Sequence, residues 1–333
     1  MSYPIKPMQV LVLDHAAADF RLAEMSRPAA AEGQVLVRII ASGVNPLDIK
    51  IRAGQAPHAR HPFPAVLGMD LAGVVEEVGP GVRQFRPGDE VYGMVGGVGG
   101  FQGTLAQYAA VDARLLALKP THLSMREAAA LPLVFITAWE GLVDRAKVDR
   151  GQKVLIQGGS GGVGHVAIQI AHAFGAEVYA TSSKSRMAIV ERFGAKGIDY
   201  ATVSPEAYVE TFTGGEGFDL IYDNVGGAVL DDSFKSVRRF GHVVSALGWG
   251  THSLAPLSFK SATYSGVFTL LPLLTGVGRE HYGDILREAT RLAENGQLVP
   301  VLDPRVFSMA NVGEAYAAIE ANTVQGKLVV DIA

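Results

Sequence analysis

The chain contains no cysteine among its 333 residues. This absence excludes disulfide bonds and thiolate zinc sites, and it is typical of proteins from a reducing compartment. The sequence also has no surplus of basic residues, because 29 Lys and Arg stand against 33 Asp and Glu. The resulting net charge of −4 gives no basic surface of the kind that binds nucleic acid, so we expect no nucleic-acid partner.

Long apolar runs are also missing. The first ten residues lack the apolar region of a signal peptide. The most apolar stretch, residues 262–277, is interrupted by polar residues and Pro272, and it is too short to span a bilayer. With 48% hydrophobic and 19% charged residues, the composition predicts a soluble globular protein, which we expect to be cytoplasmic and not bound to a membrane.

The residues that are present divide the chain into two kinds of pattern. Residues 8–120 contain short β-type runs separated by Gly and Pro turns, which indicates a mostly β domain. From residue 121 the pattern changes: Ser124-x-x-Glu127 predicts a capping box at the start of a helix, and strands then alternate with helices. This alternation predicts an α/β fold with a doubly wound parallel sheet.

The segment 153–175, KVLIQGGSGGVGHVAIQIAHAFG, organises the second part. A short apolar run of strand length is followed by a glycine cluster and then by apolar residues at helical spacing. Gly159, Gly161, Gly162 and Val163 lie within a G-x-G-x-x-G motif that ends at Gly164. Between a strand and a helix, this motif predicts a turn whose backbone N–H groups bind the pyrophosphate of a dinucleotide.

A second interpretation of the same segment is open. Gly158-x-Ser160-x-Gly162 also fits the nucleophile elbow of hydrolases, which likewise joins a strand to a helix. His242, His252 and His281 are available downstream for a catalytic triad. The elbow does not need the additional glycines, however, so dinucleotide binding is the favoured prediction.

The residues after the second strand of this part predict which nucleotide binds. NAD-binding folds place an acid there, about 20 residues after the glycines, to bind the ribose 2′-hydroxyl. This chain has Ser182, Lys184 and Arg186 in that place, and its only nearby acid, Glu177, lies at the other end of the strand. A carboxylate about 4 Å from a 2′-phosphate would repel it by about 4 kcal/mol per charge pair at an effective dielectric near 20. Hydroxyl and basic groups attract it, so we expect NADP(H) rather than NAD(H).

Several segments together resemble one family. They are residues 43–54, residues 62–79, residues 87–92, residues 128–139, the glycine-rich turn, residues 219–226 and residues 326–330. On these segments the chain resembles the zinc-independent (zeta-crystallin-like) quinone oxidoreductases of the medium-chain dehydrogenase/reductase superfamily. The resemblance covers nearly the whole chain.

The resemblance implies a two-domain enzyme. A GroES-like, mostly β catalytic domain would cover residues 1–123, a Rossmann NADP(H)-binding domain residues 124–296, and residues 297–333 would return to the catalytic domain. NADPH would bind in the cleft between the domains. The resemblance also implies a homodimer in which sheets join edge to edge.

The residue types at the metal positions of the superfamily indicate a site without metal. Metal-dependent relatives have Cys where this chain has Asn45, a His-Glu pair where it has Met69 and Asp70, and often a third ligand near Thr137. Catalytic zinc needs three protein ligands, and Asn, Met and Thr form a poor set. By resemblance, Asn45 holds the nicotinamide ribose or orients the acceptor, unless it only caps the following turn. Asp48 is a second catalytic candidate, with helix capping as its alternative role.

The resemblance also assigns residues to the cofactor. Thr137 would lie near the nicotinamide, and Lys327 would close the cleft, unless it only forms a surface salt bridge. The 2′-phosphate would be surrounded by Ser182, Lys184, Arg186 and Tyr200. The remaining contacts would come from strand ends and the segments that follow them, at Asn224, Val225, Leu247, Gly248, Phe268 and Leu270.

Without zinc, the chemistry favours acceptors that spread the incoming charge. A quinone or a C=C bond conjugated to a carbonyl becomes a phenolate or an enolate, which a few hydrogen-bond donors stabilise. We therefore expect NADPH-dependent reduction of quinones or α,β-unsaturated carbonyls. An enoyl-thioester reductase, with Arg52, His58 and Arg60 as a basic rim, and a redox sensor that binds NADPH with little turnover are the alternatives.

Overall fold

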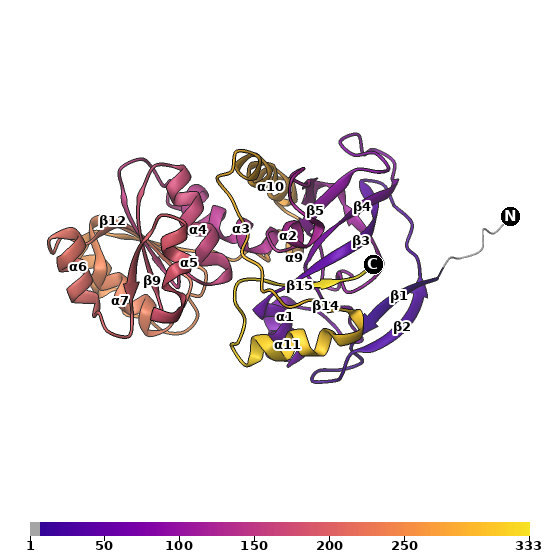
Figure 1. The fold of residues 1–333 in the computed structure, drawn as a ribbon, viewed down its shortest axis with the longest axis horizontal. Helices are drawn as coiled ribbons and strands as arrows, with labels where there is room; N and C mark the ends of the chain where they lie inside the picture. Colours follow the sequence, from indigo (N-terminus) through magenta and orange to yellow (C-terminus); the bar gives the residue numbers. More distant parts are fainter. Residues whose placement is uncertain (1–6) are drawn as a thin grey trace. The chain divides into compact units, whose positions relative to one another are not determined.

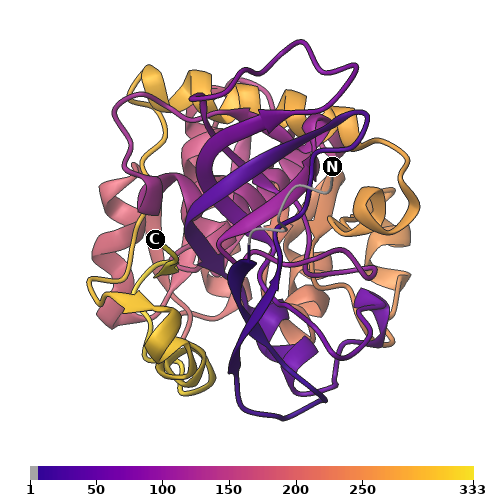
Figure 2. The ribbon, with the colours of Figure 1, turned by 90° about the vertical axis from the view of Figure 1, so that its right-hand side faces the viewer.

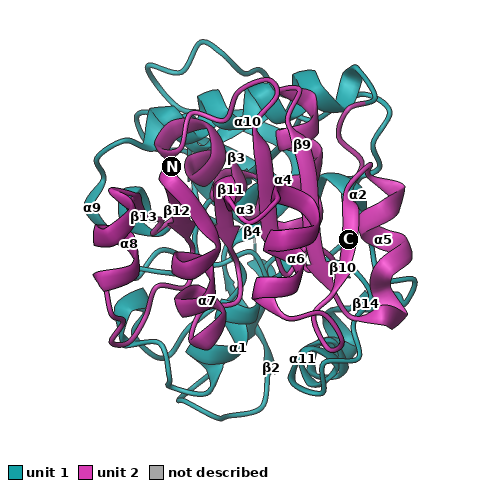
Figure 3. Ribbon diagram, turned by 90° about the vertical axis from the view of Figure 1, so that its left-hand side faces the viewer, with its two compact units in different colours: residues 1–133, 270–296, 300–333 teal, residues 134–269, 297–299 magenta. Residues whose placement is uncertain are grey.

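The computed structural model describes residues 7–333, which form two compact units. Unit 1 contains the described residues up to Leu133 together with Leu270–Gly296 and Pro300–Ala333. Unit 2 contains Val134–Thr269 and Gln297–Val299 (Figure 3).

Unit 2 is built on a six-stranded parallel sheet. Its strands are β8 (Lys153–Gln157), β9 (Glu177–Ser182), β10 (Lys196–Asp199), β11 (Phe218–Asp223), β12 (Val237–Ser245) and β13 (Thr263–Gly266). The spatial order β10-β9-β8-β11-β12-β13 corresponds to 3-2-1-4-5-6, the order of doubly wound dinucleotide-binding sheets. The strand order therefore reverses between β8 and β11, and ligands bind such sheets outside the carboxyl ends at this point.

Helices cover both faces of this sheet, with α4 and α5 on one side and α6 and α7 on the other (Figure 1). The helical segments of this part of the chain are α3 (Pro132–Trp139), a π-helical turn (Glu140–Arg145), α4 (Gly162–Ala173), the 3₁₀ turn Lys184–Arg186, α5 (Met187–Arg192), α6 (Pro205–Thr213), α7 (Ala228–Ser236) and α8 (Ala255–Lys260). Helix α6 shows how local sequence sets the bounds, because Ser204 caps its first turn and Gly214 ends it with a left-handed backbone.

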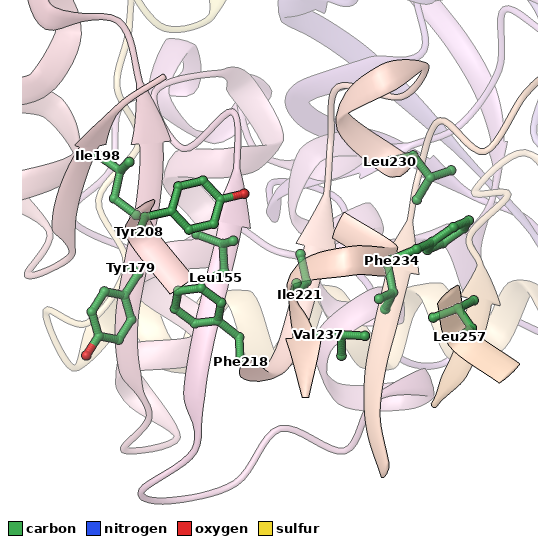
Figure 4. Close-up of a cluster of buried hydrophobic side chains, with 11 residues drawn as sticks. Leu155, Tyr179, Ile198, Tyr208, Phe218, Ile221, Leu230, Phe234, Val237 and Leu257 are labelled. Atoms are coloured by element: carbon green, nitrogen blue, oxygen red, sulfur yellow. The ribbon is translucent and has the colours of Figure 1, made fainter. Parts of the chain in front are cut away.

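One core layer of unit 2 lies between the sheet and helices α6, α7 and α8 (Figure 4). Its side chains come from the strands and from the inner faces of these helices, and they are Leu155, Tyr179, Ile198, Tyr208, Phe218, Ile221, Leu230, Phe234, Val237, Val243 and Leu257. Burying a side chain of this size stabilises the fold by about 1.5–3 kcal/mol. This layer fixes the strand ends that carry the candidate nucleotide site.

Unit 1 is mostly β. Its seven-stranded sheet has the order β14-β15-β3-β4-β5-β7, with β6 paired to β3, and a separate hairpin is formed by β1 and β2. The strands are β1 (Pro7–Val12), β2 (Arg21–Ser26), β3 (Gln34–Val44), β4 (Asp70–Val78), β5 (Glu90–Met94), β6 (Tyr108–Asp112), β7 (Leu116–Leu118), β14 (Phe307–Ser308) and β15 (Leu328–Asp331). Figure 2 shows the indigo start and the yellow end of the chain within this unit.

Short helices complete unit 1. They are α1 (Pro46–Arg52), α2 (Met125–Ala129), α9 (Leu271–Thr275), α10 (Arg279–Glu294) and α11 (Val312–Glu320), with 3₁₀ turns at Pro57–Ala59, Ala113–Leu115 and Met309–Asn311. The capping box predicted at Ser124 is confirmed: the Ser124 hydroxyl accepts a hydrogen bond from the Glu127 N–H, and the Glu127 carboxylate accepts one from the Ser124 N–H.

The compact units divide the chain differently from the expected domain ranges in three segments. Residues 124–133 and 270–296, expected in the Rossmann domain, belong to unit 1, and residues 297–299, expected in the catalytic domain, belong to unit 2. Helix α10 is held in unit 1 because the Tyr92 hydroxyl, from β5, donates a 2.7 Å hydrogen bond to the carbonyl of Leu286. Amphipathic periodicity indicates such a helix but not the sheet that it covers.

No helix within residues 7–333 is long and apolar enough to cross a membrane.

Candidate active site

The glycine-rich turn joins β8 to α4 as the sequence predicts. Gly158 has a φ of +71°, a conformation that favours glycine, and helix α4 begins at Gly162 with Gly161 as its N-cap. A Cβ atom on Gly164 would lie 2.2 Å from the carbonyl oxygen of Gly158. Only glycine at this position lets the helix pack this closely on the turn.

Buried polar groups behind the turn hold it against β9. The Thr181 hydroxyl accepts a hydrogen bond from the Gly158 N–H (2.9 Å) and donates one to Gln157 Oε1 (2.8 Å). The Gly159 N–H donates to the Thr181 carbonyl (2.8 Å). The side chains of Gln157 and Thr181 are both buried. The sequence analysis assigned Gln157 and Thr181 no role, since buried polar residues inside β-type runs carry no distinctive local pattern.

The residues expected around a 2′-phosphate lie at the ends of neighbouring strands. Ser182 ends β9, and its hydroxyl donates a 2.9 Å hydrogen bond to Ser160 in the glycine-rich turn. Tyr200 follows β10, and its N–H donates to the Ser182 carbonyl. Lys184 is exposed and Arg186 is half-buried in the 3₁₀ turn that follows β9. The structure thus gathers hydroxyl and basic groups beside the glycine-rich turn.

The nearby acid, Glu177, forms its hydrogen bonds away from the glycine-rich turn. Glu177, at the amino end of β9, accepts hydrogen bonds from Lys196 (2.5 Å) and from the Tyr179 hydroxyl (2.8 Å). The side-chain hydrogen bond from Lys196 lowers the pKa of Glu177 below its usual value. The carboxylate therefore stays ionised at the edge of the sheet opposite to the glycine-rich turn.

Asn224 and Val225 follow β11 at the point where the strand order reverses. The Asn224 Nδ2 donates to the Gln157 carbonyl (3.3 Å), while its Oδ1 is buried and has no hydrogen-bond partner within residues 7–333. A buried carboxamide oxygen without a partner is costly unless a ligand satisfies it. A dinucleotide bound at the glycine-rich turn would fit this unsatisfied oxygen of Asn224.

A carboxylate that the sequence analysis assigned no role shapes this strand end. Asp223 is buried and accepts hydrogen bonds from the N–H groups of Val225 and Gly226 (both 3.0 Å) and from the Ser245 hydroxyl (2.7 Å). Ser245 in turn accepts from the Leu247 N–H (3.0 Å). An Asp at the end of an apolar strand, followed by Asn-Val-Gly, is the signal for such a turn.

Other predicted residues of unit 2 lie near the same carboxyl ends. Leu247 is half-buried beside Gly226, and Gly248 is exposed and approached by the Tyr264 hydroxyl. The Phe268 ring meets the exposed Trp249 edge to face at 6.0 Å. These residues belong to the segments that follow β12 and β13.

Thr137 is fixed from two sides within unit 2. Its hydroxyl is hydrogen-bonded to the Thr269 hydroxyl (2.9 Å), and its carbonyl accepts from the buried Tyr222 hydroxyl (2.7 Å). The helix then widens into the π-helical turn that starts at Glu140, a feature often found at functional sites. The position of Thr137 is therefore well defined.

Unit 1 holds a buried cluster of four polar side chains, namely those of Asn45, Asp48, Asp70 and Lys327, all at most 4% exposed. Asn45 follows β3 and caps α1, and its N–H donates to Asp48 Oδ2 (2.8 Å). The Asn45 Nδ2 donates to Asp70 Oδ2 (2.9 Å), and the Lys327 ammonium donates to the Asn45 carboxamide oxygen and to the Val44 carbonyl (3.0 Å).

Burial shifts the acidities in this cluster. Desolvation raises the pKa of Asp48 to about 7 and that of Asp70 to about 6, although hydrogen bonds and the Lys327 charge partly oppose it. Desolvation also lowers the pKa of Lys327, against the attraction of Asp70 and Asp48. The cluster therefore changes its protonation near neutral pH.

Leu270, another predicted residue of unit 1, is buried just before α9.

The donor set at the positions that hold zinc in metal-dependent relatives does not suit that ion. The Asn45 carboxamide is hydrogen-bonded to Lys327 and Asp70. Met69 has a buried thioether, and the Thr137 hydroxyl is hydrogen-bonded to Thr269. Within residues 7–333, no three His, Asp or Glu side chains are grouped so that they could hold a metal ion. A metal-free site stays a prediction.

The strand order, the glycine-rich turn and the residues around it define a two-part α/β protein that binds a dinucleotide. Residues 31–121 match the family described as Alcohol dehydrogenase GroES-like domain, and residues 162–280 match the family described as Zinc-binding dehydrogenase. The chain belongs to the zinc-independent quinone oxidoreductase group of the medium-chain dehydrogenase/reductase superfamily. This membership sets aside the hydrolase alternative for Ser160.

Two curated relatives are similar over most of the chain. The 2-methylene-furan-3-one reductase of Solanum lycopersicum is 37% identical over 312 residues, which cover 91% of this chain and 73% of the relative. The chloroplastic NADPH-dependent alkenal/one oxidoreductase of Arabidopsis thaliana is 35% identical with the same coverage.

Solved structures are similar as well. An alcohol dehydrogenase superfamily protein from Novosphingobium aromaticivorans matches with a TM-score of 0.96 and 60% identity over 98% of this chain and all of that one. The CurK enoyl reductase matches with a TM-score of 0.86 and 26% identity over 98% and 99% of the two chains.

Proposed function

We propose that the protein is an NADPH-dependent reductase of quinones or α,β-unsaturated carbonyls. The observation that carries this proposal is the set of hydroxyl and basic groups at the end of β9, beside a glycine-rich turn that fits a pyrophosphate. The family membership and the NADPH-dependent relative support it. Bound NADPH would supply the hydride that reduces the acceptor.

The chain's own residues would bind and orient this cofactor. We propose that the N–H groups near Gly161, Gly162 and Val163 hold the pyrophosphate at the amino end of α4. Ser182, Lys184, Arg186 and Tyr200 would bind the 2′-phosphate. Thr137, Asn224, Val225, Leu247, Gly248, Phe268 and Leu270 would line the remainder.

Asn45 is fully buried, which limits how it can act on a bound cofactor. Neither Asn45 nor Asp48 has exposed surface, whereas Lys327 keeps a small exposed fraction and uses two of its three N–H groups on Val44 and Asn45. We propose that the third N–H of Lys327 binds the nicotinamide ribose and that Asn45 and Asp48 act through it. Conjugated acceptors then fit the site, because their oxygen takes the charge without a metal ion.

Steady-state oxidation of NADPH with matched acceptors tests this function. Turnover with 1,4-benzoquinone or a short enal, and a preference for NADPH over NADH, are the expected results. Turnover confined to crotonyl-CoA would support the enoyl-thioester alternative. Tight NADPH binding without turnover of any acceptor would support the redox-sensor alternative.

The thioester alternative has one structural counter-argument. Arg52, one of the three residues proposed as a basic rim, lies 3.7 Å from Asp19 and from Glu320, and its Nε donates to the Ala18 carbonyl. A guanidinium that is already engaged offers less to a CoA phosphate. The enoyl reductase among the similar structures keeps this alternative in the test.

We also propose a homodimer that forms along β13. This strand is at the edge of the parallel sheet, and Tyr264 within it is 36% exposed. An edge with free backbone groups can pair with a second copy. Light scattering after gel filtration should give twice the 35.2 kDa chain mass, whereas a monomer at micromolar concentration contradicts this proposal.

A cytoplasmic location is likewise a proposal, which fractionation of cells would test.

A further inference from the structure

The carboxamide of Asn45 lies between a cation and a carboxylate. Lys327 can only donate hydrogen bonds, so the group that faces it is the Asn45 oxygen. An ionised Asp70 can only accept, so the group that faces it is the Asn45 nitrogen. These two neighbours together allow a single orientation of the carboxamide.

The backbone holds Asp70 in place for this contact. Asp70 is the first residue of β4 and is paired with Gly43 of β3, two residues before Asn45. Its second oxygen accepts a 3.0 Å hydrogen bond from the Leu133 N–H. Both carboxylate oxygens thus accept a hydrogen bond from an N–H group, and a proton on either oxygen would face a donor instead of an acceptor.

The cluster has two carboxyl groups for one ammonium group. Asp48 has one oxygen on the Asn45 N–H; its Oδ1 is buried and makes no hydrogen bond of ordinary geometry within residues 7–333, although the backbone of Gly68 also stabilises the ionised carboxylate. The other titratable group beside it is the buried Tyr316 of α11, whose pKa burial raises well above its usual value. From α2, which packs on β4, Arg126 pairs with Asp331 and Glu127 caps Ser124. Asp48 is therefore the group that can carry a proton without breaking a bond to Asn45.

We propose that Asp70 is a positioning residue that acts through Asn45 to aim the ammonium group of Lys327 at the cofactor. Ionised Asp70 fixes the carboxamide, the carboxamide oxygen fixes Lys327, and a proton on Asp48 leaves the Asp70–Lys327 pair neutral overall. The proposal rests on the proposed function, because it assumes that Lys327 binds the nicotinamide ribose.

Loss of the charge on Asp70 should reverse the carboxamide. In Asp70→Asn, one oxygen and one NH₂ group replace two acceptors, so either Leu133 or Asn45 meets a donor. When Asn45 turns its oxygen toward residue 70, its NH₂ group faces the Lys327 ammonium, which is repelled. Protonation of Asp70 at low pH has the same effect, and burial places its pKa at about 6.

The first experiment needs no cofactor. The side-chain amide resonance of Asn45 is followed by ¹⁵N NMR between pH 5 and 8 in the wild type, in Asp48→Asn and in Asp70→Asn. We expect a titration near pH 6 in the wild type, because burial raises the pKa of Asp70 to about 6. The midpoint should stay similar in Asp48→Asn, because Asp48, with a pKa of about 7, is already largely protonated in that range. An Asn45 resonance in Asp70→Asn at the same position as in the wild type at pH 8 overturns the proposal, because the carboxamide would then keep its orientation without the charge on residue 70.

The second experiment measures the Kd of NADP⁺ over the same pH range for the wild type, Asp70→Asn and the control Asp14→Asn, an exposed acid of unit 1. We expect Asp70→Asn to bind at least 10-fold more weakly at pH 8, with a smaller difference at pH 5. The ratio between variants cancels the titration of the nucleotide's own phosphate. Equal binding by Asp70→Asn overturns the positioning role. A wild type that binds no nucleotide refutes the proposed function instead, while the NMR result still decides the orientation of Asn45.

Discussion

The ammonium group of Lys327 donates a hydrogen bond to the carboxamide oxygen of Asn45, 282 residues earlier in the chain. The contact exists because β15 runs antiparallel to β3, with Leu328 opposite Val44. The last strand of the protein therefore completes a polar cluster that begins in its first third.

Replacing Lys327 by Met should destabilise the protein more at pH 8 than at pH 5. The change removes the cation beside two buried carboxyl groups and leaves the Val44 and Asn45 oxygens without this donor. We expect a loss of about 3 kcal/mol in the free energy of unfolding at pH 8. At pH 5 the carboxyl groups take up protons, and the loss should be smaller.

Urea unfolding at the two pH values measures this difference. Lys50→Met is the matched control, because Lys50 is exposed on α1 in the same unit. An equal loss for Lys327→Met at both pH values would contradict the electrostatic explanation.

Asp48 should make the protein less stable as the pH rises from about 4 to 7. The pKa of Asp48 in the folded state, about 7, lies above its ordinary value of 3.8, so the folded state binds the proton more tightly. Stability therefore falls with rising pH in this window, by up to about 1.4 kcal/mol per unit of pKa shift. Asp48→Asn cannot titrate and should lose less stability over the same range.

Guanidinium unfolding of both proteins at pH 4.5, 6 and 8 tests this prediction. We expect the wild type to lose about 2–4 kcal/mol relative to Asp48→Asn between the extremes. Parallel stability curves would mean that Asp48 is not protonated in the folded protein.

Two glycines of the turn should respond differently to alanine. A Cβ on Gly164 would lie 2.2 Å from a backbone oxygen, whereas a Cβ on Gly161 would lie 3.3 Å from the same oxygen. We expect Gly164→Ala to lower the free energy of unfolding by about 2 kcal/mol or more, since backbone must move. Gly161→Ala should fold but bind NADPH more weakly, because Gly161 is the N-cap of α4 in the turn proposed to bind the pyrophosphate.

Thermal unfolding and fluorescence titration with NADPH separate these effects. Each variant serves as the control for the other, because stability should fall mainly in Gly164→Ala and NADPH affinity mainly in Gly161→Ala. A Gly161→Ala protein with unchanged nucleotide affinity would argue against pyrophosphate binding at this turn.

Arg186 and Lys184 should set the preference for NADPH. A hydrogen bond to a charged group contributes about 1.5–3 kcal/mol, so each alanine variant should lower kcat/KM for NADPH about 10-fold to 100-fold. The value for NADH should change little, because it lacks the 2′-phosphate. Arg239→Ala is the control, since Arg239 is exposed near the amino end of β12, away from the carboxyl edge.

Kinetics with both nucleotides give the ratio directly. The prediction is wrong if kcat/KM for NADPH divided by kcat/KM for NADH is the same in both alanine variants as in the wild type. A matching decrease in Arg239→Ala would indicate a general effect of net charge instead.

Much of the nucleotide-binding part could be predicted from the sequence. A strand, a glycine-rich turn and a helix are consecutive, and glycine spacing reports directly on the backbone conformation that the turn needs. The absence of an acid after β9 is also a local property, and so is the capping box at Ser124. These features involve residues a few positions apart, so their geometry follows from the sequence alone.

The environment of Asn45, by contrast, was decided by the tertiary structure. The sequence marks Asn45, Asp48, Asp70 and Lys327 as polar residues, but only the register of β3 with β4 and β15 makes them one buried cluster. The same holds for Asp223 and Ser245, which meet because β11 and β12 are neighbours. Side-chain pairs that are far apart in the chain depend on strand order and register, and burial then sets their pKa values, so local patterns cannot specify them.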